Sequence, residues 1–208
     1  MTILETIEHE ALVELRLNRP DKRNAVDDAL LTTLADAVEN LAADPTHALL
    51  LSGNGPVTCA GRDLAAVQQD DYDLHERQSG LMSALRSYPL PTAVAAKGAL
   101  IGFGFGLQLQ CDLLVVGKDT TLSLPEVDFD VDVSHRLPPL ADIIGPRVAT
   151  EMVLRGHAID GPRAFELGLA NEVVPEDAVD ERARTLLAEI MDADAEILRS
   201  ILTTARGR

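Results

Sequence analysis

The chain has 208 residues, of which 46% are hydrophobic and only 3% aromatic, with no tryptophan. This length suits one domain with a core of aliphatic side chains, and the composition argues against a surface that stacks nucleic-acid bases on aromatic rings. The formal net charge of -16 would repel DNA, RNA and anionic membranes, so none of these is expected as the main partner.

The composition also bears on the cellular setting. Lysines are few and acids abundant, as in proteins from salt-loving cells, where salt screens the self-repulsion. An ordinary acidic cytosolic protein fits the composition equally well. Two cysteines, Cys59 and Cys111, are too few for a disulfide framework, and the N-terminus carries acids where a signal peptide needs bases. We therefore expect a cytoplasmic protein.

The first half of the chain alternates predicted strands with predicted helices. Residues 11–18 alternate polar and apolar side chains and end at a Pro-containing turn, which predicts a strand. Apolar residues at helical spacing predict a helix over 26–41. A short apolar run closed by Asn-Gly predicts a buried strand over 47–55. A polar amphipathic helix over 72–88 and a small-residue strand over 91–96 follow.

The second half adds two short strands, within "LLVVGKD" and "TLSLPE". Three helices are expected after them, over 137–156, 162–168 and 176–204. No linker or exact repeat interrupts this succession of strand-strand-helix units. We therefore expect one α/β core domain over residues 1–175 and a short C-terminal helical segment over residues 176–208.

The segment "GALIGFGFGLQLQCD", residues 98–112, is uncharged until its last residue. Its 14 uncharged residues fall short of the roughly 20 that a membrane span needs. Leu107 stands where a dinucleotide-binding loop has its third glycine. Gly102 and Gly104 permit the close backbone approach of a ligand-facing turn. The alternation of apolar residues with Gly and Gln, read alone, predicts a strand.

Several motifs occur together in one order. They are "LNRPDKRNA" (17–25), "CAGRDL" (59–64), "KGALIGFGFGLQLQCD" (97–112), "LSLPE" (122–126) and "GLANEVVP" (168–175). In this order and spacing they resemble the enoyl-CoA hydratase/isomerase (crotonase) superfamily over nearly the whole chain. The resemblance implies a crotonase-like α/β spiral of strand-strand-helix units, with a helix rather than a strand after Gly102. It implies an acyl-CoA substrate, no cofactor apart from that coenzyme A, and a homotrimer or dimer of trimers.

The resemblance also implies the site residues. Two backbone N–H groups, those of Arg62 and Phe103, would form an oxyanion hole for the enolate of the thioester, and Glu126 would be the catalytic base. The positions expected to contact substrate are Lys22, Arg23, Ala25, Ala60, Asp63, Leu64 and Gly102. The Arg62 side chain is a further candidate for the CoA phosphates. Without the motif, Lys22 and Arg23 would be interpreted as a solvated turn, and Asp63 as the cap of a following helix.

One departure from the family pattern bears on the reaction. The family's hydratases use two glutamates, and the first of these positions falls on Gly106 while the second matches Glu126. Adding water to a double bond requires two proton-handling groups. Moving a double bond requires only one base, which takes a proton from C2 and returns it to C4. The hydratase-like Gly-Gly-Thr turn after the second glutamate is also absent. These features favour a 3-enoyl-CoA to 2-enoyl-CoA isomerase.

Alternatives remain open from the sequence alone. One is a hydratase or another acyl-CoA reaction, with His135 as a second proton handler, although a lone loop histidine is more often solvated. Another is a non-catalytic module that binds acyl-CoA or a partner subunit. A Cys59 nucleophile with His135 as base has no supporting local signature, and no cluster has metal-ligand spacing. The family usually continues beyond one helix after "NEVVPED", so a neighbouring subunit would complete the pocket.

Overall fold

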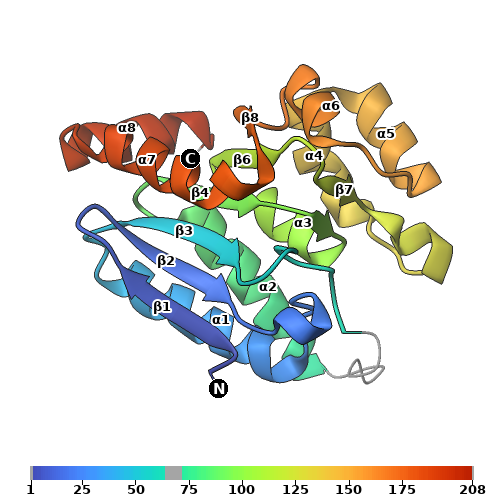
Figure 1. Cartoon of the computed structure of the whole chain (residues 1–208), viewed down its shortest axis with the longest axis horizontal. Coiled ribbons are helices and arrows are strands. Elements are labelled where there is room, and N and C mark those ends of the chain that lie inside the picture. Colours follow the sequence, from blue (N-terminus) through green and yellow to red (C-terminus); the bar gives the residue numbers. More distant parts are fainter. Residues whose placement is uncertain (1, 64–71, 208) are drawn as a thin grey trace.

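The computed structural model describes residues 2–63 and 72–207. They form a six-stranded sheet with helices on both faces and a separate two-stranded sheet (Figure 1). The strands of the large sheet, in spatial order, are β1 (Leu4–Glu8), β2 (Leu12–Leu17), β3 (Ala48–Gly53), β4 (Thr92–Ala96), β6 (Leu113–Gly117) and β8 (Glu172–Val174). The small sheet pairs β5 (Ala99–Ile101) with β7 (Thr121–Ser123).

The connections are those of a spiral. Strands β1 and β2 are antiparallel, and every other pairing is parallel. The helices are α1 (Asp28–Ala43), α2 (Tyr72–Ser87), α3 (Phe103–Gln108), α4 (Leu137–Ile144), α5 (Pro146–Arg155), α6 (Gly161–Glu166), α7 (Val179–Met191) and α8 (Ala195–Ala205). Successive units such as β4–β5–α3 place one strand in each sheet before a helix. This confirms the expected crotonase-like α/β fold.

The large sheet is covered on both faces because its strands are apolar on both sides. Alternate residues such as Leu49 and Val94 face a large cluster that includes α1, α2 and α3. The intervening residues, such as Leu50 and Ala93, pack against the apolar side of α7. Figure 1 shows this layering, with α1 and α2 on the opposite side of the sheet from α7.

Two long predicted helices are each divided in the structure. The helix expected over 137–156 breaks at Gly145, whose φ of 84° leaves the helical region, and α5 then starts at Pro146. The helix expected over 176–204 breaks before Asp194, whose side chain caps the start of α8. Two helices therefore follow "NEVVPED" rather than one. None of the helices within 2–63 and 72–207 is long and apolar enough to span a membrane.

Three short strands were not predicted. They are β1, β5 and β8, of which β5 and β8 have only three residues each. Each is defined by its pairing with a partner strand rather than by a pattern of its own. The glycine-rich segment forms β5, a turn at Gly102 and then α3, so the helix implied by the resemblance is confirmed and the strand suggested by the alternation is wrong. The division at residue 175 stays a prediction.

The end of α8 is tied to the sheet by a largely buried ion pair. Arg206 donates to both carboxylate oxygens of Asp112 at 2.7 and 2.5 Å and to the carbonyl of Tyr88 at 2.5 Å. Asp112 also accepts from the N–H and hydroxyl of Thr92. Arg206→Ala leaves this carboxylate without its charge partner, so we expect a loss of about 3 kcal/mol in the free energy of unfolding. Urea unfolding measures this loss of stability.

The matched control is Arg155→Ala. Arg155 forms an exposed pair with Glu151 one helical turn away, and such pairs contribute only about 0.3 to 0.5 kcal/mol. Equal losses in the two variants would contradict the buried role of Arg206.

Candidate active site

Two segments far apart in the sequence run side by side at the centre of the site. Cys59 donates its N–H to Ala99 at 3.1 Å, and Ile101 donates to Cys59 at 3.0 Å. Gly61, with a φ of 97°, lies so close to the second segment that a Cβ there would be 3.3 Å from the Ile101 oxygen and 3.9 Å from the Phe103 nitrogen. Only glycine permits this approach without strain.

The two expected oxyanion donors meet at this junction. Phe103 is the first residue of α3, where helical N–H groups lack intrahelical acceptors. Among the residues that the structure describes, neither the Arg62 N–H nor the Phe103 N–H donates a hydrogen bond. Arg62 and Phe103 both line a cavity of about 560 Å³. The arrangement leaves two backbone donors available for a ligand oxygen.

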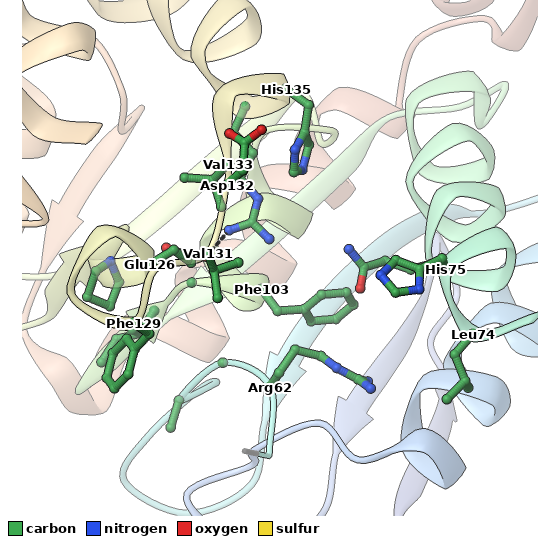
Figure 2. Close-up of a pocket in the computed structure, with 17 residues that line it drawn as sticks. Arg62, Leu74, His75, Phe103, Glu126, Phe129, Val131, Asp132, Val133 and His135 are labelled. Atoms are coloured by element: carbon green, nitrogen blue, oxygen red, sulfur yellow. Dashed lines mark hydrogen bonds and ion pairs between the residues drawn. The ribbon is translucent and has the colours of Figure 1, made fainter. Parts of the chain in front are cut away.

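The Arg62 side chain is engaged within the protein. Its guanidinium pairs with Asp28 at 2.6 Å and lies 5.9 Å from the centre of the Phe103 ring. Figure 2 shows Arg62 and Phe103 close together at the cavity. These contacts hold the guanidinium against the wall of the site, and its additional role toward CoA phosphates stays a prediction.

Glu126 lies in the 3₁₀ helix η2 (Pro125–Phe129), and its side chain is only 14% exposed. Its carboxylate packs against Gly102, where a Cβ would come within 3.1 Å of Oε1. Oε2 is buried and has no hydrogen-bond partner in the described part of the chain. The proposed base therefore lies next to the turn that carries the Phe103 N–H, with one oxygen free.

The partner of the other oxygen was not predicted. Arg136, the last residue of η3 (Ser134–Arg136), forms an ion pair with Oε1 of Glu126 and is 8% exposed. It occupies the space beside Gly106, where a Cβ would lie 3.1 Å from Nε and 3.2 Å from Cζ. The position at which the family's hydratases have their first glutamate therefore faces a guanidinium group. An arginine in a polar loop gives no sequence signal for this inward orientation.

The rest of the cavity is mainly apolar. The apolar side chains are Leu74, Ile101, Pro125, Phe129, Val131 and Val133, and the other polar ones are His75, Gln78, Asp132 and His135. Figure 2 places His135 and Asp132 on one side of the cavity and His75 and Leu74, from α2, on the other. Asp132 is exposed and accepts from the N–H and hydroxyl of Ser134. The lining residues from α2 and the apolar ones from the segment after Glu126 were missed because they carry no motif, whereas His135 was a sequence-based candidate for a second proton handler.

His135 lies in the site rather than away from it, at the exposed rim of the cavity. Partial burial and the neighbouring Arg136 charge lower the pKa of its imidazole below the usual value. A histidine with a lowered pKa is neutral at pH 7 and can accept a proton. His135 is therefore available as a second proton handler.

The predicted CoA-binding loop borders the same junction. Lys22 and Arg23 are exposed in the turn that ends η1 (Pro20–Lys22), and the Arg23 carbonyl accepts from the Ala60 N–H at 3.1 Å. The side chain of Arg19 pairs with Asp27 and Asp63 and donates to the Ala25 carbonyl.

The cavity brings together some of the predicted site residues and not others. Its lining includes Ala60, Gly102, Arg62, Phe103 and Glu126, but not Lys22, Arg23, Ala25 or Asp63. Leu64 lies outside the described residues.

The double variant Lys22→Ala/Arg23→Ala tests whether this loop binds the phosphates of CoA. If both cations contact CoA phosphates, we expect KM for an acyl-CoA to rise at least about 10-fold with kcat little changed, because each charge-assisted hydrogen bond that is lost contributes roughly 1.5 to 3 kcal/mol. The rise should shrink at high salt. Steady-state kinetics measures the change in KM. The control is Lys118→Ala, which removes an exposed lysine elsewhere on the chain. An unchanged KM would mean that the turn is only solvated.

Cys59 is buried and is not among the described residues that line the cavity. Burial raises the pKa of its thiol to about 11, so the nucleophilic thiolate is scarce at neutral pH. Its side chain packs against α3, where a Cβ on Gly104 would lie 2.7 Å from the Cys59 Cβ. The buried-thiol interpretation is therefore favoured over a nucleophile.

A spiral α/β fold with a buried carboxylate beside two unused backbone N–H groups places the protein in the class of crotonase-type acyl-CoA enzymes. A sequence profile of the enoyl-CoA hydratase/isomerase family matches residues 8–206. The chain belongs to this family.

Relatives agree with this assignment. The chain is 30% identical to a 2,3-dehydroadipyl-CoA hydratase of Escherichia coli, with 91% of this chain and 76% of that protein covered. It is 29% identical to a hydroxycinnamoyl-CoA hydratase-lyase of Pseudomonas fluorescens, over 89% and 67%. The solved enoyl-CoA hydratase of Mycobacterium smegmatis superposes with a TM-score of 0.88 at 27% identity, covering all of this chain and 82% of that one.

Proposed function

We propose that this acyl-CoA enzyme converts 3-enoyl-CoA to 2-enoyl-CoA. The observation that carries the proposal is the pairing of Glu126 with a guanidinium beside Gly106, which leaves Glu126 as the one buried carboxylate at the oxyanion turn among the described residues. Asp132, the other carboxylate among the described lining residues, is exposed and bound to Ser134. One base suffices for moving a double bond, because it can take a proton at one carbon and return it at another.

The reaction balances with this one base. Glu126 removes a proton from C2, and the electrons of the C–H bond move toward the thioester oxygen to give a dienolate. The N–H groups of Arg62 and Phe103 stabilise this oxyanion, and one such donor typically contributes about 2.7 to 4 kcal/mol to the transition state. The carbonyl then re-forms, the double bond moves to C2–C3, and C4 takes the proton back from Glu126.

Substrate binding and assembly complete the proposal. Lys22 and Arg23 would meet the phosphates of coenzyme A, and the apolar lining of the cavity would hold the acyl chain. No further cofactor is required by this chemistry. We also propose a homotrimer or a dimer of trimers. Light scattering after size exclusion measures the molar mass of the assembly.

Hydration of a 2-enoyl-CoA is the second candidate. It is favoured by the names of the relatives, and by His135, whose lowered pKa leaves a neutral imidazole on the same cavity as Glu126. In this case His135 would activate the water while Glu126 handles the proton at C2.

A substrate panel separates the candidates. The protein is assayed with 3-enoyl-CoA and 2-enoyl-CoA of several chain lengths, and binding of a saturated acyl-CoA is measured by calorimetry. Isomerisation that survives His135→Ala supports the first candidate. Hydration that is lost in His135→Ala supports the second. Tight binding without turnover of either substrate supports a non-catalytic acyl-CoA-binding module.

A further inference from the structure

We infer that Arg136 is the positioning residue of Glu126: it fixes which carboxylate oxygen carries the proton, and it occupies the volume that a second carboxylate would need. The inference rests on the proposed assignment of Glu126 as the base. It concerns a residue that no motif of the family resemblance includes.

The backbone around Arg136 holds its side chain in place. The Arg136 N–H donates to the Val133 carbonyl at 2.8 Å, and α4 begins at the next residue with two prolines in its first turn. Prolines fix φ at these positions and stiffen the start of the helix. The guanidinium is therefore presented from a rigid junction, and being 8% exposed and permanently charged it needs an anionic partner. Glu126 is that partner.

The two oxygens of Glu126 have different surroundings. Oε1 is bound to Arg136 and packs against Gly102, whereas Oε2 is buried without a hydrogen bond among the described residues. The terminal torsion of a glutamate is otherwise broad, so an unheld carboxylate can exchange its two oxygens. With Oε1 held, Oε2 is the oxygen that takes the proton from C2 and returns it to C4.

Gly106 and Arg136 share one volume. A Cβ at position 106 would lie 3.1 to 3.4 Å from three atoms of the guanidinium, which is closer than ordinary van der Waals contact. A side chain of glutamate size at position 106 and the present Arg136 rotamer therefore exclude each other. The absence of a side chain at Gly106 is what allows the arginine to reach Glu126.

A proton label reads out this arrangement directly. Because the protonated carboxylate would be buried and held, the proton removed from C2 should return to C4 faster than it exchanges with water. We expect 3-enoyl-CoA deuterated at C2 to give 2-enoyl-CoA with most of the transferred label at C4, measured by mass spectrometry.

The variants are Arg136→Ala and Arg136→Lys. A misplaced base typically costs about 100-fold in rate, so Arg136→Ala should lose about that much kcat with KM within a few-fold, and should retain less label. Added guanidinium ion should restore at least roughly 10-fold of the lost rate by occupying the vacated site. Arg136→Lys keeps the charge but not the planar fork of donors, so its kcat and its label retention should fall between those of Arg136→Ala and the wild-type protein. The control is Arg155→Ala, an exposed arginine whose loss should change none of these values.

A second readout separates this inference from the proposed function. Exchange of the C2 proton of a saturated acyl-CoA in D₂O needs the base and the oxyanion donors but no double-bond movement. Wild-type exchange without isomerisation would overturn the proposed function, and the same Arg136 variants would still test the inference by their exchange rates. If Arg136→Ala does not fold, Arg136→Lys supplies the comparison.

Three results would overturn the inference. The first is unchanged kcat and label retention in Arg136→Ala or, if that variant does not fold, in Arg136→Lys. The second is a wild-type protein that neither isomerises nor exchanges. The third is a KM that rises in the variants only for acyl groups with a terminal carboxylate, which would make Arg136 a substrate-binding residue instead.

Discussion

Glu126→Gln is expected to lower kcat for 3-enoyl-CoA isomerisation by about 100- to 10,000-fold, the usual contribution of a positioned acid-base group. An amide has nearly the shape of a carboxylate but cannot accept the C2 proton. The N–H groups of Arg62 and Phe103 are untouched, so KM should change by no more than a few-fold. Steady-state kinetics with 3-enoyl-CoA gives both values.

Asp128→Asn is the matched control, because Asp128 belongs to the same 3₁₀ helix and its side chain is exposed. It should retain wild-type kcat. Glu126→Gln also leaves Arg136 without a full negative charge, so thermal unfolding and calorimetric binding of a saturated acyl-CoA must show that the variant is folded. A folded Glu126→Gln variant with wild-type kcat would remove Glu126 as the base.

The oxyanion turn shows what the sequence can predict. The alternation across the glycine-rich segment suggests a strand, yet Phe103 to Gln108 form α3 with every residue buried. A helix that is buried on all sides has no polar face, so periodicity loses its meaning there. The resemblance carried by "CAGRDL" and "LSLPE" predicted the helix. It also predicted which residues line the cavity on the oxyanion side, because backbone donors depend on position in a motif more than on side-chain identity.

The other side of the cavity could not be predicted in this way. Arg136 and His135 belong to the short helix η3 in the connection between η2 and α4, and the orientation of a side chain in such a connection depends on its contacts in the folded chain. The local pattern suggested that His135 is solvated, and it said nothing of a buried arginine. The breaks at Gly145 and before Asp194 had local signals, a Gly-Pro pair and a capping aspartate. The apolar spacing on either side of each break outweighed those signals.

The proposed isomerase reaction is connected with one missing side chain. Gly106 removes a carboxylate and, by the same change, admits the guanidinium that holds the remaining one. If the proposal holds, returning the glutamate alone should not give a hydratase, because Arg136 occupies the space beside position 106. This coupling makes position 106 the sharpest test of why isomerisation is favoured.

Gly106→Glu alone is expected to lower isomerisation by at least about 10-fold without creating hydration. The new carboxylate would arise within contact distance of Arg136 and would draw the guanidinium away from Glu126, which misplaces the base. Gly106→Ala is the control for volume alone, and it should disturb the ion pair without offering a new anion. The rates of 3-enoyl-CoA isomerisation and 2-enoyl-CoA hydration are measured side by side.

Gly106→Glu combined with Arg136→Ala is expected to hydrate 2-enoyl-CoA at least about 10-fold faster than the wild-type protein or either single variant, as a second acid-base group enters the site. Two neighbouring carboxyl groups repel as anions, so one tends to hold a proton while the other is ionised, which suits a reaction that needs both an acid and a base. The double variant must first show a cooperative unfolding transition. If it is folded and binds acyl-CoA yet hydrates no faster than Arg136→Ala, the arginine is not what keeps the second carboxylate from acting. The apolar side chains of Phe129, Val131 and Val133, which line the cavity, then become the barrier to water.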